Sequence, residues 1–330
     1  MIRDARGNTG TTRTVHEHAR RFAARGWRVT VIGERVDPVP GAEVVRLTRW
    51  PIWSRPAFAW RADRLLEGYD VVHGHGDNYR QDVLSLHNCV HAAHEAVHGR
   101  PHDGGGVARV HERMLRERRF KRLICNSELM RQDVIARFGV PREMTEVIYP
   151  GYDPERFKPG RREDVRRELG AGPDDFLVGV ITSGDFKKRG VDLFRAAMTR
   201  LPRLKSVIIG KGPGAIAPVA DVEKYYQALD LYVHPAHWEE FGQSVQEALA
   251  CGVPVLSTKR VGACELMGPL HRALLLEKPD VEALAAAIDR LAGDGGLRER
   301  LRAEGPASVR GNDWERNFQA TLSCFSKIKA

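Results

Sequence analysis

Two glutamates and a glycine mark the segment of this 330-residue sequence that is best suited to chemistry. In HPAHWEEFGQSVQEALACG, Glu239 and Glu247 lie eight residues apart, and Gly242 precedes a predicted helix that begins near Gln243. Main-chain amides at the start of that helix, near Gln243 and Ser244, can approach a diphosphate because Gly242 has no side chain. The Glu247 carboxylate is suited to binding a ribose diol. The alternative is that Glu247 is a solvated surface residue, as isolated helix glutamates usually are.

Three consecutive cations occupy a second loop, in the segment TSGDFKKRGVDLF. Lys187, Lys188 and Arg189 fall between a predicted strand and a predicted helix, where their charges can neutralise a leaving diphosphate. Lys211, in IIGKGPG, is a further candidate for a position near a nucleotide. A basic solvated turn is the alternative explanation for any one of these residues.

A histidine-rich stretch contains HEAVH at 94–98, a literal match to the HExxH pattern of zinc proteases. The sequence Arg100–Pro101 ends the predicted helix just after the second histidine, so the context for catalytic zinc is poor. We expect no catalytic metal here, because a local excess of histidines favours accidental matches. For His73, His75 and Asp77, which alternate along a predicted strand, we expect a polar strand end.

The composition excludes several classes of protein. With 42% apolar residues, 29% charged residues and 18 prolines, the chain can form a core and is not a low-complexity disordered protein. It contains no apolar run long enough to span a bilayer, and its first residues, MIRDARGNTG, contain no apolar stretch, so we expect no secretory signal. The five cysteines include no CxxC pair, which predicts a reduced, cytoplasmic protein.

The net charge of +9 is unevenly distributed. Residues 1–150 carry 25 Lys and Arg against 18 Asp and Glu, whereas residues 151–330 carry 27 against 25. A basic first half suits an anionic partner such as a nucleic acid, an acidic lipid surface or a phosphorylated substrate, and a solvated basic surface is equally compatible. Nucleic acid is disfavoured because no recognition helix or RNA-binding motif accompanies the charge.

Predicted buried strands alternate with amphipathic helices along the whole chain, which predicts an α/β protein with parallel, doubly wound sheets. The charged, Pro- and Gly-rich segment that begins YPGYDPERFKPG suggests a linker, so we expect an N-terminal domain over 1–150 and a C-terminal domain over 151–312. The last helix, over 313–330, is expected to cross back to the first domain. A ligand is expected in a cleft between the domains.

The opening of the N-terminal domain is irregular. Such domains begin with a strand that leads into a glycine-rich turn, yet GNTGTT follows only six residues. Either the first strand is missing or the true start lies upstream.

The segment around the two glutamates resembles a signature of retaining GT-B glycosyltransferases of family 4, the glycosyl transferases group 1. That family usually has EPFG followed by a helix ending EA-x-A-x-G-x-P-V; here the pattern is EEFG at 239–242 and EALACGVPV at 247–255. The stretches ICNSELMRQDVIARFGVP, VIYPGYDPERFKP, DVVHGH, GKGP and LDLYVHPA are also similar to the family. The resemblance covers nearly the whole chain and implies a GT-B fold of two facing Rossmann-like domains.

The cationic loop departs from the family pattern. The family usually places an arginine directly after the strand and a lysine before the glycine, whereas here Ser183 stands near the first position and Arg189 occupies the second. Lys187 is expected to supply the missing charge, as in the lipopolysaccharide-core glucosyltransferases that this loop resembles most.

The resemblance also implies residue roles. Glu239 would position the donor sugar, Glu247 the ribose, and His87, at the end of VLSLHN, would lie near the sugar ring or the acceptor. A strand-end histidine bonded to the backbone is the alternative for His87. The implied catalytic residues are His87, Glu239, Lys187 and Arg189. The implied donor-binding residues are Gly10, Lys188, Lys211, Phe241, Gly242, Gln243, Ser244 and Glu247, with Gly7 and Thr11 beside Gly10 in the first turn.

The activity implied is transfer of a hexose, with retention of configuration, from a nucleotide-sugar (a UDP-hexose is favoured) to a hydroxyl of a cell-envelope glycan or glycolipid. The departing phosphate would help to deprotonate that hydroxyl. The chain contains no D-x-D triad, so no metal and no other cofactor is expected.

Two other functions compete with this one. A non-catalytic or degenerate GT-B scaffold or partner subunit is favoured by Ser183 and by the irregular opening. A GT-B sugar-nucleotide epimerase is disfavoured by the E-x7-E arrangement. We expect a cytoplasmic protein whose basic helix, ARVHERMLRERRFKR, docks peripherally on the anionic inner face of the plasma membrane or is simply solvated.

Overall fold

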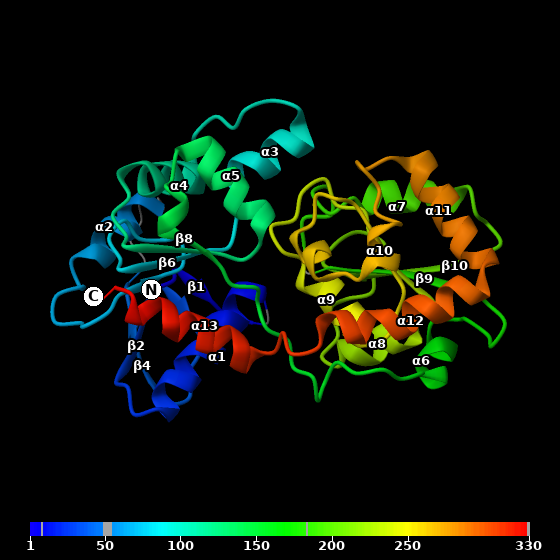
Figure 1. Cartoon of the computed structure of the whole chain (residues 1–330), viewed down its shortest axis with the longest axis horizontal. Coiled ribbons are helices and arrows are strands. Elements are labelled where there is room, and N and C mark those ends of the chain that lie inside the picture. The colour runs from blue at the N-terminus through cyan, green and yellow to red at the C-terminus, as the bar shows by residue number, and fades with distance from the viewer. Residues whose placement is uncertain (8, 49–54, 183, 329–330) are drawn as a thin grey trace. The chain divides into compact units, whose positions relative to one another are not determined.

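The computed structural model describes residues 1–330 with the exception of residues 8, 49–54, 183 and 329–330. The chain divides into two compact units. Unit 1 consists of Met1–Gly151 together with Trp314–Ala330, and unit 2 consists of Tyr152–Asp313. The last helix therefore packs with the first half of the chain, and each unit is an α/β structure in its own right (Figure 1).

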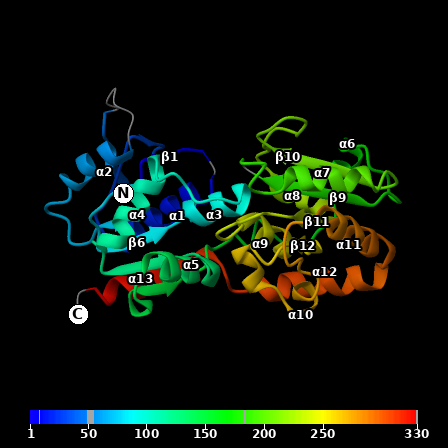
Figure 2. The same cartoon turned by 90° about the horizontal axis from the view of Figure 1, so that it is seen from above.

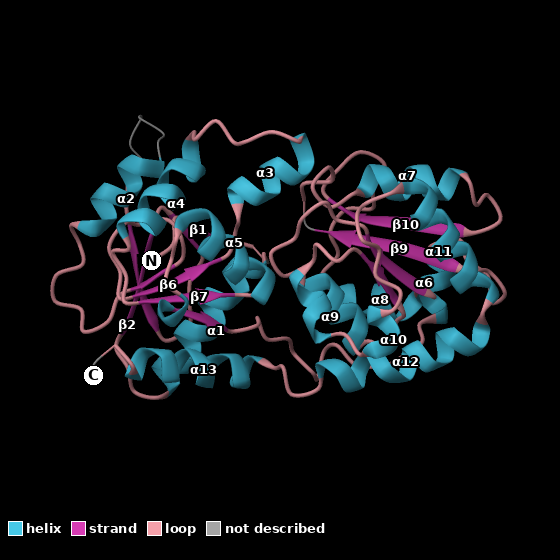
Figure 3. Cartoon of the chain, turned by 45° about the horizontal axis from the view of Figure 1, so that its top comes forward, coloured by secondary structure: helices cyan, strands magenta, loops and turns pink. Residues whose placement is uncertain are grey.

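Unit 1 is built on short parallel strands. They are β1 (Asp4–Ala5), β2 (Val29–Gly33), β3 (Arg35–Val36), β4 (Ala42–Arg46), β5 (His73–Gly74), β6 (Val83–Leu86), β7 (Arg122–Cys125) and β8 (Thr145–Val147). The helices are α1 (Gly10–Ala24), α2 (Arg55–Asp63), α3 (Val90–His98), α4 (Gly106–Glu117), α5 (Glu128–Phe138) and α13 (Trp314–Ser326), with a 3-10 turn at Arg142–Met144. Helices α1 and α13 lie on one side of the strands, and α2, α4 and α5 lie on the other (Figures 1 and 3).

The strand expected before the GNTGTT turn is short rather than missing. The amide of Ile2 donates to the carbonyl of Ile32 at 3.1 Å, and the amide of His75 donates to the carbonyl of Met1 at 3.0 Å. The segment that enters β1 therefore lies between β2 and β5, as the first strand of a doubly wound sheet does.

Helix α1 illustrates how the sequence positions the elements of unit 1. The Thr9 side chain caps its N-terminus by accepting from the amide of Thr12 at 3.2 Å. Its buried stripe includes Phe22, whose ring lies 4.7 Å from that of Phe318 and 5.2 Å from that of Phe325, both on α13. Aromatic packing of this kind holds the C-terminal helix against the rest of unit 1.

Unit 2 contains one parallel sheet in the order β10-β9-β11-β12. The strands are β9 (Leu177–Thr182), β10 (Lys205–Gly210), β11 (Leu231–His234) and β12 (Val255–Ser257). The helices are α6 (Glu163–Glu168), α7 (Val191–Thr199), α8 (Val222–Ala228), α9 (Gln243–Ala250), α10 (Pro269–Arg272), α11 (Val281–Gly293) and α12 (Gly295–Val309), with a 3-10 turn at Gly262–Leu266. Helices α7 and α11 pack together on one face of the sheet, and α8 and α9 lie on the other (Figures 1 and 2). Every residue of β9, β11 and β12 is buried, so the core of unit 2 holds the loops that follow these strands in place.

The basic helix of the first half corresponds to α4 and the residues after it. Met114 and Leu115 are buried, as is Phe120 just beyond the helix, so these apolar side chains belong to the core and not to a surface. Several of the arginines pair with glutamates of the same segment, as Arg113 does with Glu117. Docking of the remaining basic face on a membrane stays a prediction. No helix within the described part of the chain has the length and apolar character needed to cross a bilayer.

Candidate active site

The junction between β11 and α9 forms the centre of the candidate site. Strand β11 ends at His234, an eight-residue loop follows, and α9 begins at Gln243. Gly242 precedes the helix with a φ of 91°, a left-handed conformation that side chains disfavour. A Cβ atom at this position would lie 3.0 Å from Cγ1 of Val261 and 3.3 Å from Cγ of Glu239. Both the backbone conformation and the tight packing therefore require glycine where the helix begins.

Glu239 is 7% exposed and forms an ion pair with Arg189, whose Nε donates to the Glu239 Oε2 at 2.8 Å. Next to this pair, the Nζ of Lys188 lies 2.6 Å from Oε2 of Glu240. The main chain fixes the position of Glu239, because its amide donates to the Arg260 carbonyl at 2.9 Å. The structure thus brings together the loop that carries Glu239 and Glu240, the acidic loop, and the loop that carries Lys188 and Arg189, the cationic loop. The two loops are separated by about fifty residues in the sequence.

The charges of this cluster are held in their ionised forms. Burial alone would raise the pKa of Glu239, but the adjacent Arg189 and Lys188 cations outweigh it and lower the pKa to about 2. Burial likewise works against the charge of Lys188, and the Glu239 and Glu240 carboxylates reverse that effect and raise the pKa of the lysine. A carboxylate that stays ionised beside two cations can hold a hydroxyl-bearing ligand without changing its own protonation state.

The cationic loop itself is fixed by a glycine. Gly190 has a φ of 69° and precedes α7, and a Cβ atom there would lie 2.1 Å from the carbonyl oxygen of Pro235. The amide of His237 donates to the carbonyl of Lys188 at 2.8 Å. Because the backbones of the two loops touch, Lys188 and Arg189 have defined positions relative to the start of α9.

Glu247 is 5% exposed, so it is not a solvated surface glutamate. Its Oε2 accepts a hydrogen bond of 3.1 Å from the hydroxyl of Tyr226, a fully buried residue of α8. Burial raises the pKa of Tyr226 well above its ordinary value, and the Glu247 charge adds to this effect, so the phenol remains a hydrogen-bond donor. The contact fixes the orientation of the Glu247 carboxylate.

Buried aromatic and imidazole rings connect the two glutamates. The Tyr226 ring packs edge-on against Tyr232, whose hydroxyl lies 3.1 Å from Nδ1 of His234. The Nε2 of His234 lies 3.9 Å from Oε2 of Glu239. Burial lowers the pKa of His234 to about 4 despite the opposing effect of Glu239, so the imidazole is neutral near pH 7. The route from Glu247 to Glu239 therefore runs through well-packed side chains.

The other predicted residues of unit 2 differ in how deeply they are buried. Phe241 is buried, while Gln243 and Ser244 are half-buried in the first turn of α9. Lys187 and Lys211 are both exposed, and in the part of the chain that the structure describes neither forms an ion pair. Ser183, for which the sequence suggested an unusual substitution, lies outside the described residues.

His87 and Gly10 belong to unit 1. His87 directly follows β6, and its Nε2 lies 2.9 Å from Nδ1 of His75, with the two rings stacked. Burial lowers the pKa of His87 to about 3, so this ring too is neutral at ordinary pH. Gly10 is the first residue of α1, as expected for a glycine-rich turn. The partner of His87 is thus a second side chain rather than only the backbone.

In the HExxH segment of α3, the glutamate is held by an arginine. Both carboxylate oxygens of Glu95 accept from Arg137, at 2.8 and 2.9 Å, so this glutamate is not placed to activate water. The rings of His94 and His98 lie 4.5 Å apart, yet among the described residues no group of three His, Cys, Asp or Glu side chains could hold a metal ion. His73 and His75 are partners of neighbouring side chains, His73 Nε2 lying 2.7 Å from Oγ of Ser85.

Four site residues were not singled out from the sequence: Tyr226, Tyr232, His234 and Glu240. Tyr232 and His234 are two residues apart in the strand LYVH, so their side chains share a face of the sheet, and this spacing could have indicated them. Tyr226 lies on a different helix from Glu247, and nothing in the sequence pattern pairs the two.

Two family models match the chain. The model "Glycosyltransferase Family 4" matches residues 8–156, and the model "Glycosyl transferases group 1" matches residues 214–308, the part that contains the acidic loop and α9. The first match covers most of the Met1–Gly151 part of unit 1 and the second lies within unit 2, so the resemblance extends along most of the chain.

Curated relatives agree with these models. A "D-inositol 3-phosphate glycosyltransferase" of Actinosynnema mirum is 28% identical over 240 residues, which cover 63% of this chain and 58% of that protein. A protein of the same name from Mycobacterium marinum is 27% identical over 237 residues, which cover 62% of this chain and 50% of the relative. The matches therefore span only half to three-fifths of the length of these relatives.

Solved structures show the same fold. WaaG, a glycosyltransferase involved in lipopolysaccharide biosynthesis, has a TM-score of 0.81 at 20% identity, with 97% of both chains covered. Anabaena Alr3699/HepE in complex with UDP-glucose has a TM-score of 0.80 at 18% identity, with 99% of this chain and 98% of that chain covered. With its two Rossmann-like units and its E-x7-E loop, this chain belongs to the group 1, family 4 glycosyltransferases and has the GT-B fold.

Proposed function

We propose that the protein transfers a hexose from a nucleotide-sugar, with a UDP-hexose favoured, to a hydroxyl of a cell-envelope glycan or glycolipid. The observation that carries the proposal is the buried cluster of Glu239, Arg189 and Lys188 beside the glycine-led start of α9. The UDP-glucose complex of the Anabaena neighbour and the lipopolysaccharide role of WaaG support the donor and the acceptor class.

The donor would lie along α9. The diphosphate would meet the amides of the first turn, near Gln243 and Ser244, where the helix dipole favours negative charge. The ribose diol would bind the Glu247 carboxylate, which Tyr226 already orients. The hexose would bind Glu239, a carboxylate that keeps its charge.

The leaving diphosphate would be stabilised by the protein's own cations. Lys187, Lys188 and Arg189 supply three positive charges, and Glu239 and Glu240 compensate two of them. The exposed Lys187 would make the direct contact, and Lys211 would lie near the nucleotide. Fixed charges that face developing negative charge are the largest contribution in many enzymes, and for this reason we propose a reaction that needs no metal.

The chemistry would retain the anomeric configuration. The bond between the sugar C1 and the phosphate oxygen would break, and a bond between C1 and the acceptor oxygen would form on the same face. The acceptor proton would pass to the departing phosphate oxygen, so no side chain need act as a nucleophile. The neutral His87 would contact the sugar ring or the acceptor.

A donor screen tests the proposal. The purified protein is incubated with UDP-, GDP- and ADP-hexoses, and donor hydrolysis and transfer are measured for the wild type and for Glu239→Gln. The expected result is slow hydrolysis of one donor, lost in the variant while donor binding persists. Donor binding without turnover by the wild type would favour a non-catalytic scaffold, and the absence of any donor binding would contradict the proposal.

A further inference from the structure

Three loops of unit 2 meet beyond the carboxyl ends of its parallel strands. The cationic loop follows β9 and carries Lys187, the acidic loop follows β11 and carries His237, and a third loop follows β12 and carries Arg260. Strands β9, β11 and β12 are neighbours in the sheet, so the three loops are neighbours as well. Ligands of open α/β sheets bind at this edge, and side chains of all three loops can therefore reach a common ligand.

Main-chain hydrogen bonds fix the three loops against one another. The His237 amide donates to the Lys188 carbonyl at 2.8 Å, which joins the acidic loop to the cationic loop. The Glu239 amide donates to the Arg260 carbonyl at 2.9 Å, which joins the acidic loop to the third loop. The backbones that carry Lys187, His237 and Arg260 are therefore held in place before any ligand binds.

The charged side chains at the centre of the candidate site compensate one another. Arg189 pairs with Glu239, and Lys188 pairs with Glu240, so two cations of the cationic loop face two carboxylates of the acidic loop. All four side chains are largely withdrawn from solvent. A bound diphosphate therefore needs positive charge beyond that of Lys188 and Arg189.

Lys187, His237 and Arg260 supply positive charge that no carboxylate compensates. Lys187 is exposed, and the other two residues are half-buried. Among the residues that the structure describes, none of the three side chains forms an ion pair or a hydrogen bond. Burial lowers the pKa of His237, and the charges of Arg260 and Lys187 lower it further, so both cations lie near the imidazole. We call these three residues the basic cluster.

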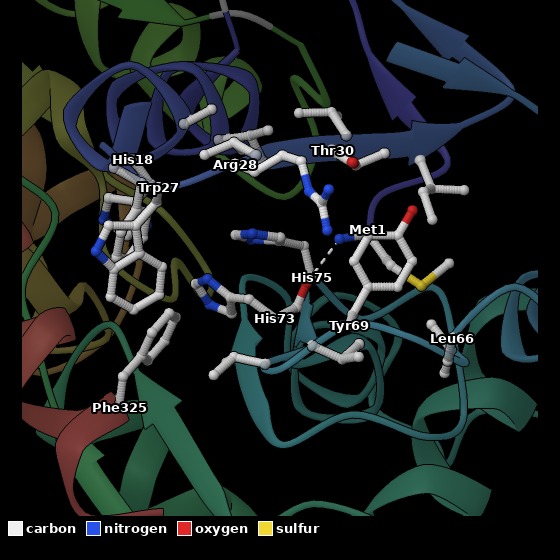
Figure 4. Close-up of a pocket in the computed structure, with 18 residues that line it drawn as sticks. Met1, His18, Trp27, Arg28, Thr30, Leu66, Tyr69, His73, His75 and Phe325 are labelled. Atoms are coloured by element: carbon white, nitrogen blue, oxygen red, sulfur yellow. Dashed lines mark hydrogen bonds between the residues drawn. The ribbon is translucent and has the colours of Figure 1, made fainter. Parts of the chain in front are cut away.

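Histidines of unit 1 lie in a different setting. His73 and His75 lie side by side in Figure 4, with ring centres 4.3 Å apart. Their rings are bonded to the side chains of Ser85 and His87, and burial holds the pKa of both well below the ordinary value. His237 is instead half-buried, without a side-chain partner among the described residues, and near two cations, which suits it to contact an anion.

We propose that Arg260 and His237 join Lys187 in binding the diphosphate of the nucleotide-sugar and stabilising it as the leaving group. This inference rests on the proposed transfer reaction and adds two residues to it from two further loops. Departure of the sugar adds negative charge to the diphosphate, and the planar guanidinium of Arg260 offers several N–H donors to phosphate oxygens. The His237 imidazole takes up a proton from solvent when this anion binds beside it.

The binding of UDP and of uridine to the full chain separates the diphosphate from the rest of the nucleotide. Arg260→Gln is expected to raise the Kd of UDP by about tenfold, the effect of losing a charged hydrogen bond, and to leave the Kd of uridine unchanged. Arg260→Lys keeps the charge and should recover part of the loss. Isothermal titration gives these constants, and thermal unfolding shows that each variant is folded.

Lys259→Gln is the matched control. Lys259 directly precedes Arg260, and its ammonium group pairs with Glu277 on the exposed surface, so this variant removes a cation from the same loop but not from the basic cluster. Its Kd for UDP should match that of the wild type. Equal values in Arg260→Gln and Lys259→Gln would overturn the proposal. So would an equal loss of affinity for UDP and for uridine in Arg260→Gln, which would mark a purely structural role.

The protonation of His237 provides a second readout. Its pKa should rise when UDP binds, because the diphosphate offsets the charges of Lys187 and Arg260. NMR follows the Cε1 proton of the ring, which is identified by its disappearance in His237→Gln. A pKa that stays constant at saturating UDP would remove His237 from the site. A wild-type chain that binds none of UDP, GDP and ADP would contradict the proposed function as well, whereas binding that is unaffected in Arg260→Gln contradicts this inference alone.

Discussion

The Nε atom of Arg189 lies 2.8 Å from Oε2 of Glu239, and both side chains are largely withdrawn from solvent. Removing one partner leaves the other charge buried and unpaired, which costs about 3 kcal/mol in such pairs. We expect Arg189→Gln to lower Tm markedly and to reduce donor turnover by roughly 100-fold. Thermal unfolding and a donor hydrolysis assay measure both effects.

The control for that variant is Arg200→Gln, which breaks an exposed pair with Glu282 on the same unit. Exposed pairs contribute little, so its Tm and turnover should match those of the wild type. If Arg189→Gln behaved like Arg200→Gln, the buried pair would have no special role in the site.

Glu247 and Tyr226 make a second testable contact, because the hydroxyl of Tyr226 fixes the carboxylate that we assign to the ribose. Glu247→Ala should raise the Kd of the nucleotide donor by roughly tenfold or more, the effect of losing a charged hydrogen bond. Tyr226→Phe should raise it by about threefold, since it only releases the orientation. Isothermal titration with the donor nucleotide gives both values.

Tyr225 supplies a matched control on the same helix. Its hydroxyl donates to Glu168 at 2.9 Å on the exposed surface, so Tyr225→Phe also removes a Tyr–Glu hydrogen bond. Donor affinity should be unchanged in this variant. An equal loss in Tyr225→Phe and Tyr226→Phe would assign the effect to the helix and not to Glu247.

Gly242 allows the backbone to be tested without altering a charge. Gly242→Ala places a methyl group 3.0 Å from Val261 and imposes a positive φ on alanine, so both stability and turnover should fall. Gly170→Ala has a similar φ of 73° with open space around the added methyl. We expect both variants to lose stability from backbone strain, with a further loss in Gly242→Ala from its tight packing, and turnover to fall only in Gly242→Ala. Preserved turnover in Gly242→Ala would show that the start of α9 is not part of the site.

The bond between His75 and His87 predicts an unusual pH profile. Because burial lowers the pKa of His87 to about 3, the ring stays neutral from pH 5 to 8, and no step near pH 6.5 should come from this residue. His87→Ala should reduce kcat, and His75→Phe should reduce it less, since it removes only the 2.9 Å contact that orients the ring. A step near pH 6.5 that disappears in His87→Ala would contradict this assignment.

Buried histidines should make the fold sensitive to acid. Burial is the largest cause of a lowered pKa at several histidines, among them His18, His73, His75, His87, His111 and His234. Below pH 6.5 the unfolded chain binds protons that the folded chain does not, so stability falls as the pH falls, by about 1.4 kcal/mol per pH unit for each such residue.

The carboxylate of Glu239 affects folding stability at a lower pH than the histidines do. Its pKa is about 2 in the folded protein, so the stability it contributes is complete above its ordinary value of 4.5 and is lost only on further acidification. A steep decline of Tm between pH 6.5 and 5 would therefore come from the histidines. A Tm that is constant over this interval would show that the folded protein takes up these protons.

Particular residues show which features the sequence could predict. The α/β alternation and the E-x7-E segment predicted the fold class, because periodicity and a long specific motif can be recognised without knowing which residues are in contact. Glu239 and Arg189 could be suspected singly, yet their pairing depends on two loops that meet only in the folded sheet. The Tyr226 contact could not be predicted, since it joins side chains from two different helices.

The return of α13 to unit 1 has a consequence for biosynthesis. Phe318 and Phe325 pack on Phe22, but the ribosome makes them only after all of unit 2. Until they emerge, the nascent first half would expose the apolar surface that these rings cover, while unit 2 is already fully translated. Unit 1 can therefore complete its core only after unit 2 has been synthesised, and nascent chains stalled before Trp314 should engage chaperones through this uncovered face.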